Sequence, residues 1–160
     1  MERRGATKTV LILTIITLTC LTAFKSKDKS TISEGLKGAK NKKELSGVVY
    51  NALKRHDFNL MQAFIPGTDE VELINKKVSY QHKNNESIKA ELQKSFHHII
   101  ESGIDKNINW SLVELVDQQI EDGNEISLIR LELEDHRGHK LTVNIKLIEI
   151  EDRWYITELV

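Results

Sequence analysis

The sequence predicts an α+β fold in which helices come first and a four-stranded antiparallel meander follows. Two observations carry this prediction. Apolar residues recur at helical spacing up to about residue 102, whereas from Ile108 onwards they alternate with polar residues. The alternating runs are joined by connections too short for crossovers, so neighbouring strands must be antiparallel. We expect the helices to pack on the concave side of this sheet.

The first three helices are marked by their ends. Asn41 and Glu44 have the spacing of a capping box, which predicts a helix start at Asn41. A short second helix is expected over residues 58–65, because Pro66-Gly67 follows it. Thr68 is the predicted N-cap of a third helix that extends to about residue 83.

The fourth helix is predicted to run from Asn84-Asn85 to Ser102. Gly103 directly follows the last turn, where glycine takes the left-handed conformation most easily. We therefore expect Gly103 to end the helix in a Schellman motif, with Ile104 folded back onto Ile99.

Four strands are then predicted, over residues 108–120, 126–134, 140–150 and 153–160. In the second and third strands, alternate apolar residues predict one buried and one wet face. The third strand adds Ile148 and Ile150 on the opposite face. These two residues predict a bulge or a second, smaller apolar contact.

The beginning of the chain has the pattern of an export signal. Arg3, Arg4 and Lys8 precede an apolar run over residues 9–24. A helix over this run would rise about 24 Å, short of the roughly 30 Å of a bilayer core. A cleaved signal is therefore favoured over a permanent membrane span.

Three fates of this segment remain open, and they centre on Cys20, the only cysteine. A lipoprotein would be cut before Cys20 and lipidated there, although Thr17 and Thr19 stand where a lipobox has Leu and a small residue. Ordinary signal cleavage after Ala23 would leave Phe24 as the first residue. An uncleaved anchor is the third alternative.

The chain is thus interpreted as a leader (1–23), a flexible charged leash (24–40) and one α+β domain (41–160). Residues 24–44 hold seven lysines and three acidic residues, whereas residues 45–160 hold 13 basic and 20 acidic residues. The leash has little apolar material to bury, which favours disorder. The acidic domain argues against nucleic acid as a partner, since phosphate binding needs a basic face.

The order of elements resembles the cystatin-like or NTF2-like cone, in which helices lie across a curved antiparallel sheet. The residues that carry this resemblance are 54–58 (KRHDF), 103–105 (GID) and 151–156 (EDRWYI). The chain is also similar to small exported lipoproteins of Gram-negative bacteria. The resemblance implies a fold far more than a function.

Enzymes of this cone use a buried acid or base in a pocket between sheet and helices, so polar residues near apolar stripes are the candidates. Tyr50, His56 and Tyr80 come closest, but none has a second polar group at a fixed spacing, and we interpret all three as structural. No catalytic residue, cofactor or cofactor-binding residue is therefore predicted.

Two pairs of residues offer candidate metal ligands. His97 and Glu101 share a helical face, and His136 and His139 flank a predicted turn. Two ligands do not make a site, so no metal is predicted.

Cystatin-type protease inhibition is a minor alternative. Residues 118–122 (QQIED) match the inhibitors' Gln-x-Val-x-Gly loop at glutamine, with Ile120 for valine and Asp122 for glycine. Trp154 invites comparison with the second-loop tryptophan, but Arg153 precedes it where proline would stand.

The leading functional hypothesis is a non-enzymatic cell-envelope module. It would be tethered to a membrane by its N-terminus and would bind an envelope protein, a peptide or a small ligand. The alternative is an exported enzyme or small-ligand carrier that uses an internal pocket.

Overall fold

The structure, a computed structural model, describes residues 37–77 and 83–160. The predicted leader, with Cys20, Ala23 and Phe24, lies outside these residues, and so does Tyr80. The described residues belong to one compact unit, Leu36–Val160. In chain order its helical elements are α2 (Lys42–Arg55), the 3₁₀ helix η1 (Phe58–Phe64), α3 (Thr68–Lys77), α4 (Asn85–Asp105) and the 3₁₀ turn η2 (Trp110–Leu112).

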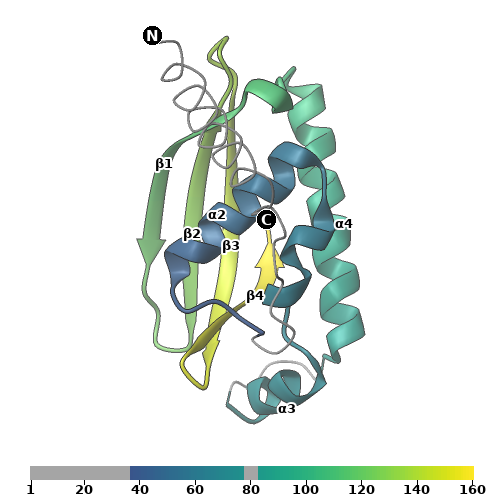
Figure 1. Cartoon of the computed structure of the whole chain (residues 1–160), viewed down its shortest axis with the longest axis vertical. Coiled ribbons are helices and arrows are strands. Elements are labelled where there is room, and N and C mark those ends of the chain that lie inside the picture. Colours follow the sequence, from purple (N-terminus) through teal and green to yellow (C-terminus); the bar gives the residue numbers. More distant parts are fainter. Residues whose placement is uncertain (1–36, 78–82) are drawn as a thin grey trace, which may run out of the picture. The chain divides into compact units, whose positions relative to one another are not determined.

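A four-stranded antiparallel sheet follows the helices, which confirms the α+β prediction (Figure 1). Its strands are β1 (Glu114–Glu121), β2 (Ile126–Glu134), β3 (Lys140–Ile150) and β4 (Arg153–Leu159), and they lie in the order β1-β2-β3-β4. Each strand therefore pairs with its neighbour in the chain, as the short connections predicted. The first strand begins six residues later than expected, because residues 110–112 form η2.

The main core lies between one face of this sheet and helices α2 and α4; in Figure 1, α2 crosses in front of the sheet and α4 runs alongside it, on the side of β4. The alternation predicted for β2 and β3 is confirmed, since the inward residues of both strands are buried. From the sheet these are Ile129, Leu131, Leu133, Leu141, Val143, Ile145 and Leu147, and from the helices they meet Leu45, Val49, Leu53, Leu92 and Phe96.

Helix α3 also reaches the opposite face of the sheet, so the prediction that the helices pack on the concave side alone was wrong, although Val71 of α3 belongs to the main core. Ile74 of α3 forms a separate apolar cluster with Ile148 and Ile150 of β3 and Tyr155 of β4. The second, smaller contact predicted from Ile148 and Ile150 is thereby confirmed. The physical reason is that the end of β3 is apolar on both faces, and each face requires a cover.

Two predicted helix starts had different outcomes. Asn41 caps α2 as expected, since its side chain accepts a hydrogen bond from the N–H of Glu44 at 2.9 Å. Thr68, in contrast, is the first residue of α3 and not its N-cap. The N–H of Gly67 instead donates a hydrogen bond at 2.9 Å to the side-chain carboxylate of Glu70, which lies in the first turn of α3.

The predicted end of α4 at Gly103 was wrong, because the helix continues to Asp105. The Schellman motif exists four residues further on: Asn107 takes the left-handed conformation (φ 58°), and the N–H of Ile108 donates to the carbonyl of Gly103 at 2.8 Å. Ile104 is exposed and does not fold back onto the helix.

Both edge strands contain a bulge. In β1 the register with β2 shifts between Leu115 and Asp117, which leaves Val116 as the extra residue. In β4 the register with β3 shifts opposite Lys146 and Leu147, and Thr157 is the extra residue. The hydroxyl of Thr157 donates to the carbonyl of Lys146 at 3.2 Å.

The chain enters the folded unit beside β4. Ala39 is fully buried and forms an isolated antiparallel bridge with Trp154. The last residues of the segment interpreted as a leash therefore belong to the core.

Candidate functional site

A groove of about 640 Å³ lies between helix α4 and the edge of the sheet formed by β4 and the start of β3. The apolar side chains that line it are Leu92 and Ile99 of α4, Leu141 of β3 and Leu159 of β4. Polar residues complete the lining, among them Ser95, His98 and Ser102 of α4, Thr142 of β3, and Thr157 of β4. The groove thus combines an apolar floor with polar sides, as binding sites commonly do.

The charged side chains of the groove differ in whether they are paired. Glu158 accepts a hydrogen bond from Lys146 at 2.8 Å, and Glu91 is ion-paired with Lys83. Lys94 and Lys106 also line the groove, and within the described part of the chain neither ammonium group has an ion-pair partner. Two ammonium groups of the groove are therefore without an ion-pair partner among the described residues.

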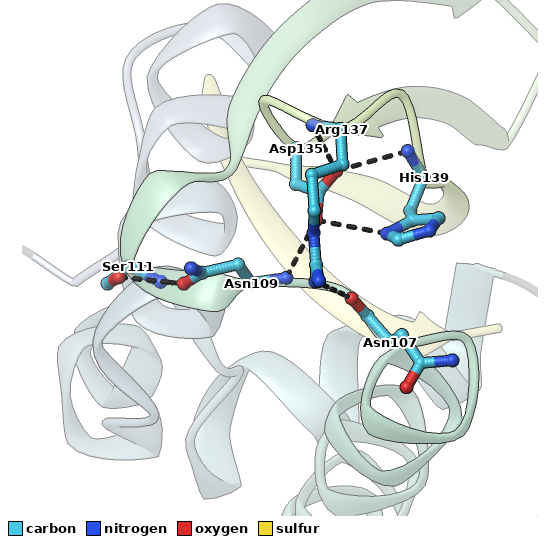
Figure 2. A network of polar contacts seen from close by, with 6 residues as sticks. All are labelled: Asn107, Asn109, Ser111, Asp135, Arg137 and His139. Carbon is cyan, nitrogen blue, oxygen red and sulfur yellow. Dashed lines mark hydrogen bonds and ion pairs between the residues drawn. The ribbon is translucent and has the colours of Figure 1, made fainter.

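A second polar site surrounds the buried carboxylate of Asp135, in the turn between β2 and β3 (Figure 2). One oxygen accepts the backbone N–H groups of Arg137 at 2.8 Å and His139 at 3.1 Å. The other accepts the N–H of Asn109 at 3.0 Å and lies 3.2 Å from Nδ1 of His139. A single carboxylate thus joins the hairpin to the segment that follows α4.

These hydrogen bonds determine how Asp135 ionises. Burial by itself would raise the pKa of the carboxyl group, because it disfavours the charge. The hydrogen bonds from Asn109, Arg137 and His139 outweigh that effect and hold the pKa of Asp135 well below its ordinary value. Asp135 is therefore a fixed negative charge at neutral pH.

The Asp135 site has the chemistry of a structural junction. The guanidinium of Arg137 lies 3.4 Å from the carboxylate and also donates to the carbonyl of Asn107, where the chain leaves α4. Ser111 is the nearest hydroxyl drawn in Figure 2, but it donates to Asn109 at 2.7 Å and points away from His139. Among the residues drawn in Figure 2, no hydroxyl group is directed at the ring of His139 as a nucleophile would be.

Two candidate residues from the sequence have structural positions. The hydroxyl of Tyr50 donates to the carbonyl of Val113 at 3.0 Å and accepts from Lys54 at 3.1 Å. His56 ends α2 in the left-handed conformation (φ 54°), with its ring edge-on to Trp110.

The candidate metal ligands are not brought into a cluster. Residues 37–77 and 83–160 contain no group of three or more His, Cys, Asp or Glu side chains able to hold a metal ion. His97 and Glu101 are exposed on α4, and His136 is exposed in the turn while His139 contacts Asp135.

The segment compared with the cystatin loop is mostly strand. Gln118, Gln119, Ile120 and Glu121 pair with β2, and only Asp122 lies in the turn, where it is ion-paired with Lys42. The ring of Trp154 is half-buried beneath the ammonium group of Lys42, at 4.2 Å from the ring centroid. Trp154 therefore does not project from the tip of its hairpin.

Comparison of the chain with protein-family models, with curated proteins and with solved structures finds no match in any of the three. Within the described ranges, no helix is long and apolar enough to cross a membrane.

Sequence reasoning did not find the groove or the Asp135 junction. A signal for the junction existed, since Asp135 stands three residues before Gly138, a spacing typical of a type I turn in which Asp accepts local N–H groups. The groove left no signal, because Lys94 is an ordinary exposed position of α4 and Lys106 an exposed residue just after it until β4 is placed beside them.

Proposed function

We propose that the protein is an exported, non-enzymatic binding module, tethered to the cell envelope through its N-terminus, that holds its ligand in the groove between α4 and β4. The groove carries the proposal. It offers about 640 Å³, an apolar floor, and the unpaired ammonium groups of Lys94 and Lys106. A volume of this size is typical of sites for small molecules and short peptides.

The pairing of the groove's carboxylates supports binding over catalysis. A general acid or base needs a carboxyl or imidazole group aimed at the reacting atoms. Glu91 and Glu158 are instead engaged by Lys83 and Lys146. His98, the imidazole of the groove, is exposed on α4.

The envelope location rests on the leader and the basic segment behind it. Arg3, Arg4 and the apolar run support export, and Cys20 supports a lipid anchor. We also propose that the protein is related to the cystatin-like or NTF2-like cones. The support for this relationship is the order of elements, in which helices precede an antiparallel meander.

The anchor is tested by mass spectrometry of the mature N-terminus, for the natural chain and for Cys20→Ala expressed in a Gram-negative host. An acylated Cys20 that is lost in the variant supports the lipid tether. An intact Met1 supports an uncleaved anchor. A first residue at Phe24 in both proteins would remove the tether from the proposal.

The binding site is tested by placing a photo-crosslinking amino acid at Ser95, inside the groove, in the full chain within intact envelopes. The matched control carries it at Lys89, which is exposed on the same helix outside the groove. We expect a discrete adduct from position 95 and none from position 89. Equal labelling at both positions, or no adduct at position 95, contradicts the proposal.

The apolar floor also favours a second candidate, a carrier of a small apolar ligand. Native mass spectrometry of the full chain purified from envelopes distinguishes the two. A bound mass of a few hundred daltons that is lost on Ser95→Trp, which fills the groove, would establish the carrier.

A further inference from the structure

Strand β1 forms an open edge of the sheet. It is the outermost strand in the order β1-β2-β3-β4, and in Figure 1 no described element lies beyond it. Asn144 of β3 exchanges both of its backbone hydrogen bonds with β4, at 2.8 and 2.9 Å, so its partner on β2, Arg130, faces β1. Gln119 lies opposite Arg130 and therefore faces β2. Its neighbours in the chain, Gln118 and Ile120, direct their N–H and C=O groups away from the sheet.

The side chains of β1 agree with this orientation. The N–H of Gln118 donates to Oδ1 of the neighbouring Asp117 at 2.8 Å, and Oδ2 of Asp117 accepts from the side chain of Gln119 at 3.0 Å. Among the described residues, neither the N–H nor the C=O of Ile120 has a hydrogen-bond partner. The edge thus offers free groups at Ile120 and, at Gln118, a donor that is held only by the carboxylate of Asp117.

A single added strand can pair with both residues, because Gln118 and Ile120 lie two apart on the same edge. The bulge at Val116 precedes this stretch, and the register with β2 is regular from Asp117 to Glu121. A strand advances about 3.4 Å per residue, so these residues offer about 17 Å of straight edge. That length accommodates an extended segment of about five or six residues.

The two faces of this edge differ in chemistry. Ile120 is paired with Ile129 of the main core, so it lies on the inner face of the sheet, yet its side chain is 42% exposed. Asp117 and Glu121 alternate with it and lie on the outer face, where both are exposed. An added strand would therefore place every second residue beside an apolar side chain and the others beside carboxylates.

The carboxylates of the outer face lack counter-charges. Asp117 lies directly opposite Glu132, and like charges in such a cross-strand pair destabilise a sheet. Within the described ranges, Asp117, Glu121 and Glu132 form no ion pair. Arg130 lies on the same face, but its Nε donates to Asn144 of β3 at 3.5 Å. A cation on an added strand would relieve a repulsion that the described fold leaves uncompensated.

Asp117 also makes the edge selective. A neutral strand must displace its carboxylate from the N–H of Gln118 without offering it another donor, and charged side chains protect edge strands in this way. A Lys or Arg side chain gives the carboxylate a new, charged donor. A second copy of the chain would bring its own Asp117 and Glu121 to the edge, so pairing between copies is disfavoured.

We propose that the edge of β1 is a second docking surface, separate from the groove, for an extended protein segment in which Lys or Arg alternates with apolar residues. The added strand pairs with Gln118 and Ile120. Its basic side chains meet Asp117 and Glu121 on the outer face, and its apolar side chains lie beside Ile120 on the inner face.

The probe is a capped, fluorescently labelled hexapeptide of alternating Lys and Val, added to the full chain in a non-ionic detergent. We expect saturable binding by fluorescence anisotropy, and slower hydrogen exchange at the amide of Ile120, because this amide becomes hydrogen-bonded. In an antiparallel pairing, the valines that share the inner face with Ile120 direct their amides at β1, and the lysine amides point away.

This geometry gives a matched pair of control peptides. N-methylation of the valine amides should weaken binding at least about tenfold, whereas N-methylation of the lysine amides should leave it nearly unchanged. The reverse order would indicate that the strand adds in parallel. An equal effect of the two methylations, or no binding of the unmethylated peptide, would overturn strand addition.

The charge selection is tested by Asp117→Asn combined with Glu121→Gln, which removes both charges and retains an acceptor for the N–H of Gln118. This variant should bind the Lys-Val peptide about fivefold more weakly or worse. Glu101→Gln combined with Asp105→Asn makes the same change in net charge at exposed positions of α4 and should leave binding unchanged. Equal affinity of the two variants for the peptide would overturn the inference.

Pairing between copies is tested by sedimentation velocity over a range of protein concentrations, with and without the peptide. We expect no dimer that the peptide dissociates. Such a dimer would assign the edge of β1 to a second copy and overturn the inference. The outcome at β1 is separate from that at position 95, because an adduct there reports on the groove alone.

Discussion

Gly103 lies against the indole ring of Trp110, so closely that a Cβ atom on residue 103 would be 2.3 Å from Cζ2 of the tryptophan. Gly103 is buried within α4, and its backbone φ is not in the left-handed region. Its role is therefore steric: it leaves room for Trp110, which is buried in the core.

Gly103→Ala should destabilise the protein although alanine favours helix. The helix gain is at most about 1 kcal/mol, whereas overpacking a core typically costs about 1–3 kcal/mol. We expect a net loss of about 1–2 kcal/mol in the free energy of unfolding, measured by chemical denaturation. The matched control is Gly47→Ala in α2, where an added Cβ meets nothing within 4 Å and stability should rise by about 0.5–1 kcal/mol. A gain at both positions would contradict the packing role of Gly103.

Asn107→Ala should destabilise the end of α4, because residue 107 has φ 58° and an alanine there costs roughly 1–2 kcal/mol. Asn107→Gly retains the left-handed conformation without a Cβ and should be close to neutral. Thermal unfolding of the two variants checks this order. If alanine and glycine have equal effects, the backbone conformation of residue 107 does not control the helix end.

Asp135→Asn should lower stability at neutral pH and reduce its dependence on acid. The folded-state pKa of Asp135 is depressed, so its contribution is present above the unfolded pKa of about 3.9 and is lost as the pH falls through the folded pKa. The natural protein should therefore lose stability progressively below about pH 5, and the variant should lose less.

The measurement for Asp135 is urea denaturation at a series of pH values from neutral to strongly acidic. Asp105→Asn, at an exposed position at the end of α4, is the control and should retain the pH dependence of the natural protein. Parallel pH profiles for Asp135→Asn and the natural protein would show that the Asp135 junction does not contribute to the loss of stability in acid.

Ile74→Ala should loosen α3 selectively. Ile74 is the residue by which α3 joins the cluster with Ile148 and Tyr155, and removing such a buried side chain costs about 2–5 kcal/mol. Hydrogen exchange should accelerate in α3 while β2 and α2, which belong to the main core, keep their protection. Uniform acceleration across the unit would mean that the two clusters form one cooperative core.

The strands were predictable because their signals are local. The bounds of β2 and β3 coincide with those read from the sequence, since alternation and short turns are properties of neighbouring residues. The start of β1 was misplaced because η2 contains the same kind of apolar residues as a strand. Local period alone does not distinguish the two.

The features that the sequence analysis misplaced or missed depend on contacts between segments that are far apart in the chain. Gly103 has the sequence signature of a helix end, but Trp110 determines its role. The position of α3 depends on which face of β3 remains uncovered once α2 and α4 have packed. The groove, likewise, exists only because Leu159 is placed beside α4.

The bridge between Ala39 and Trp154 joins residues near opposite ends of the folded unit. The three strand ladders close short loops, at a small cost in chain entropy, whereas this bridge must wait until both ends have been brought together. It should be the last backbone pairing to form during folding and the first to open. A protease added under native conditions should therefore cut near residue 39 before it reaches the sheet, trimming the chain at the junction between its N-terminal segment and its core.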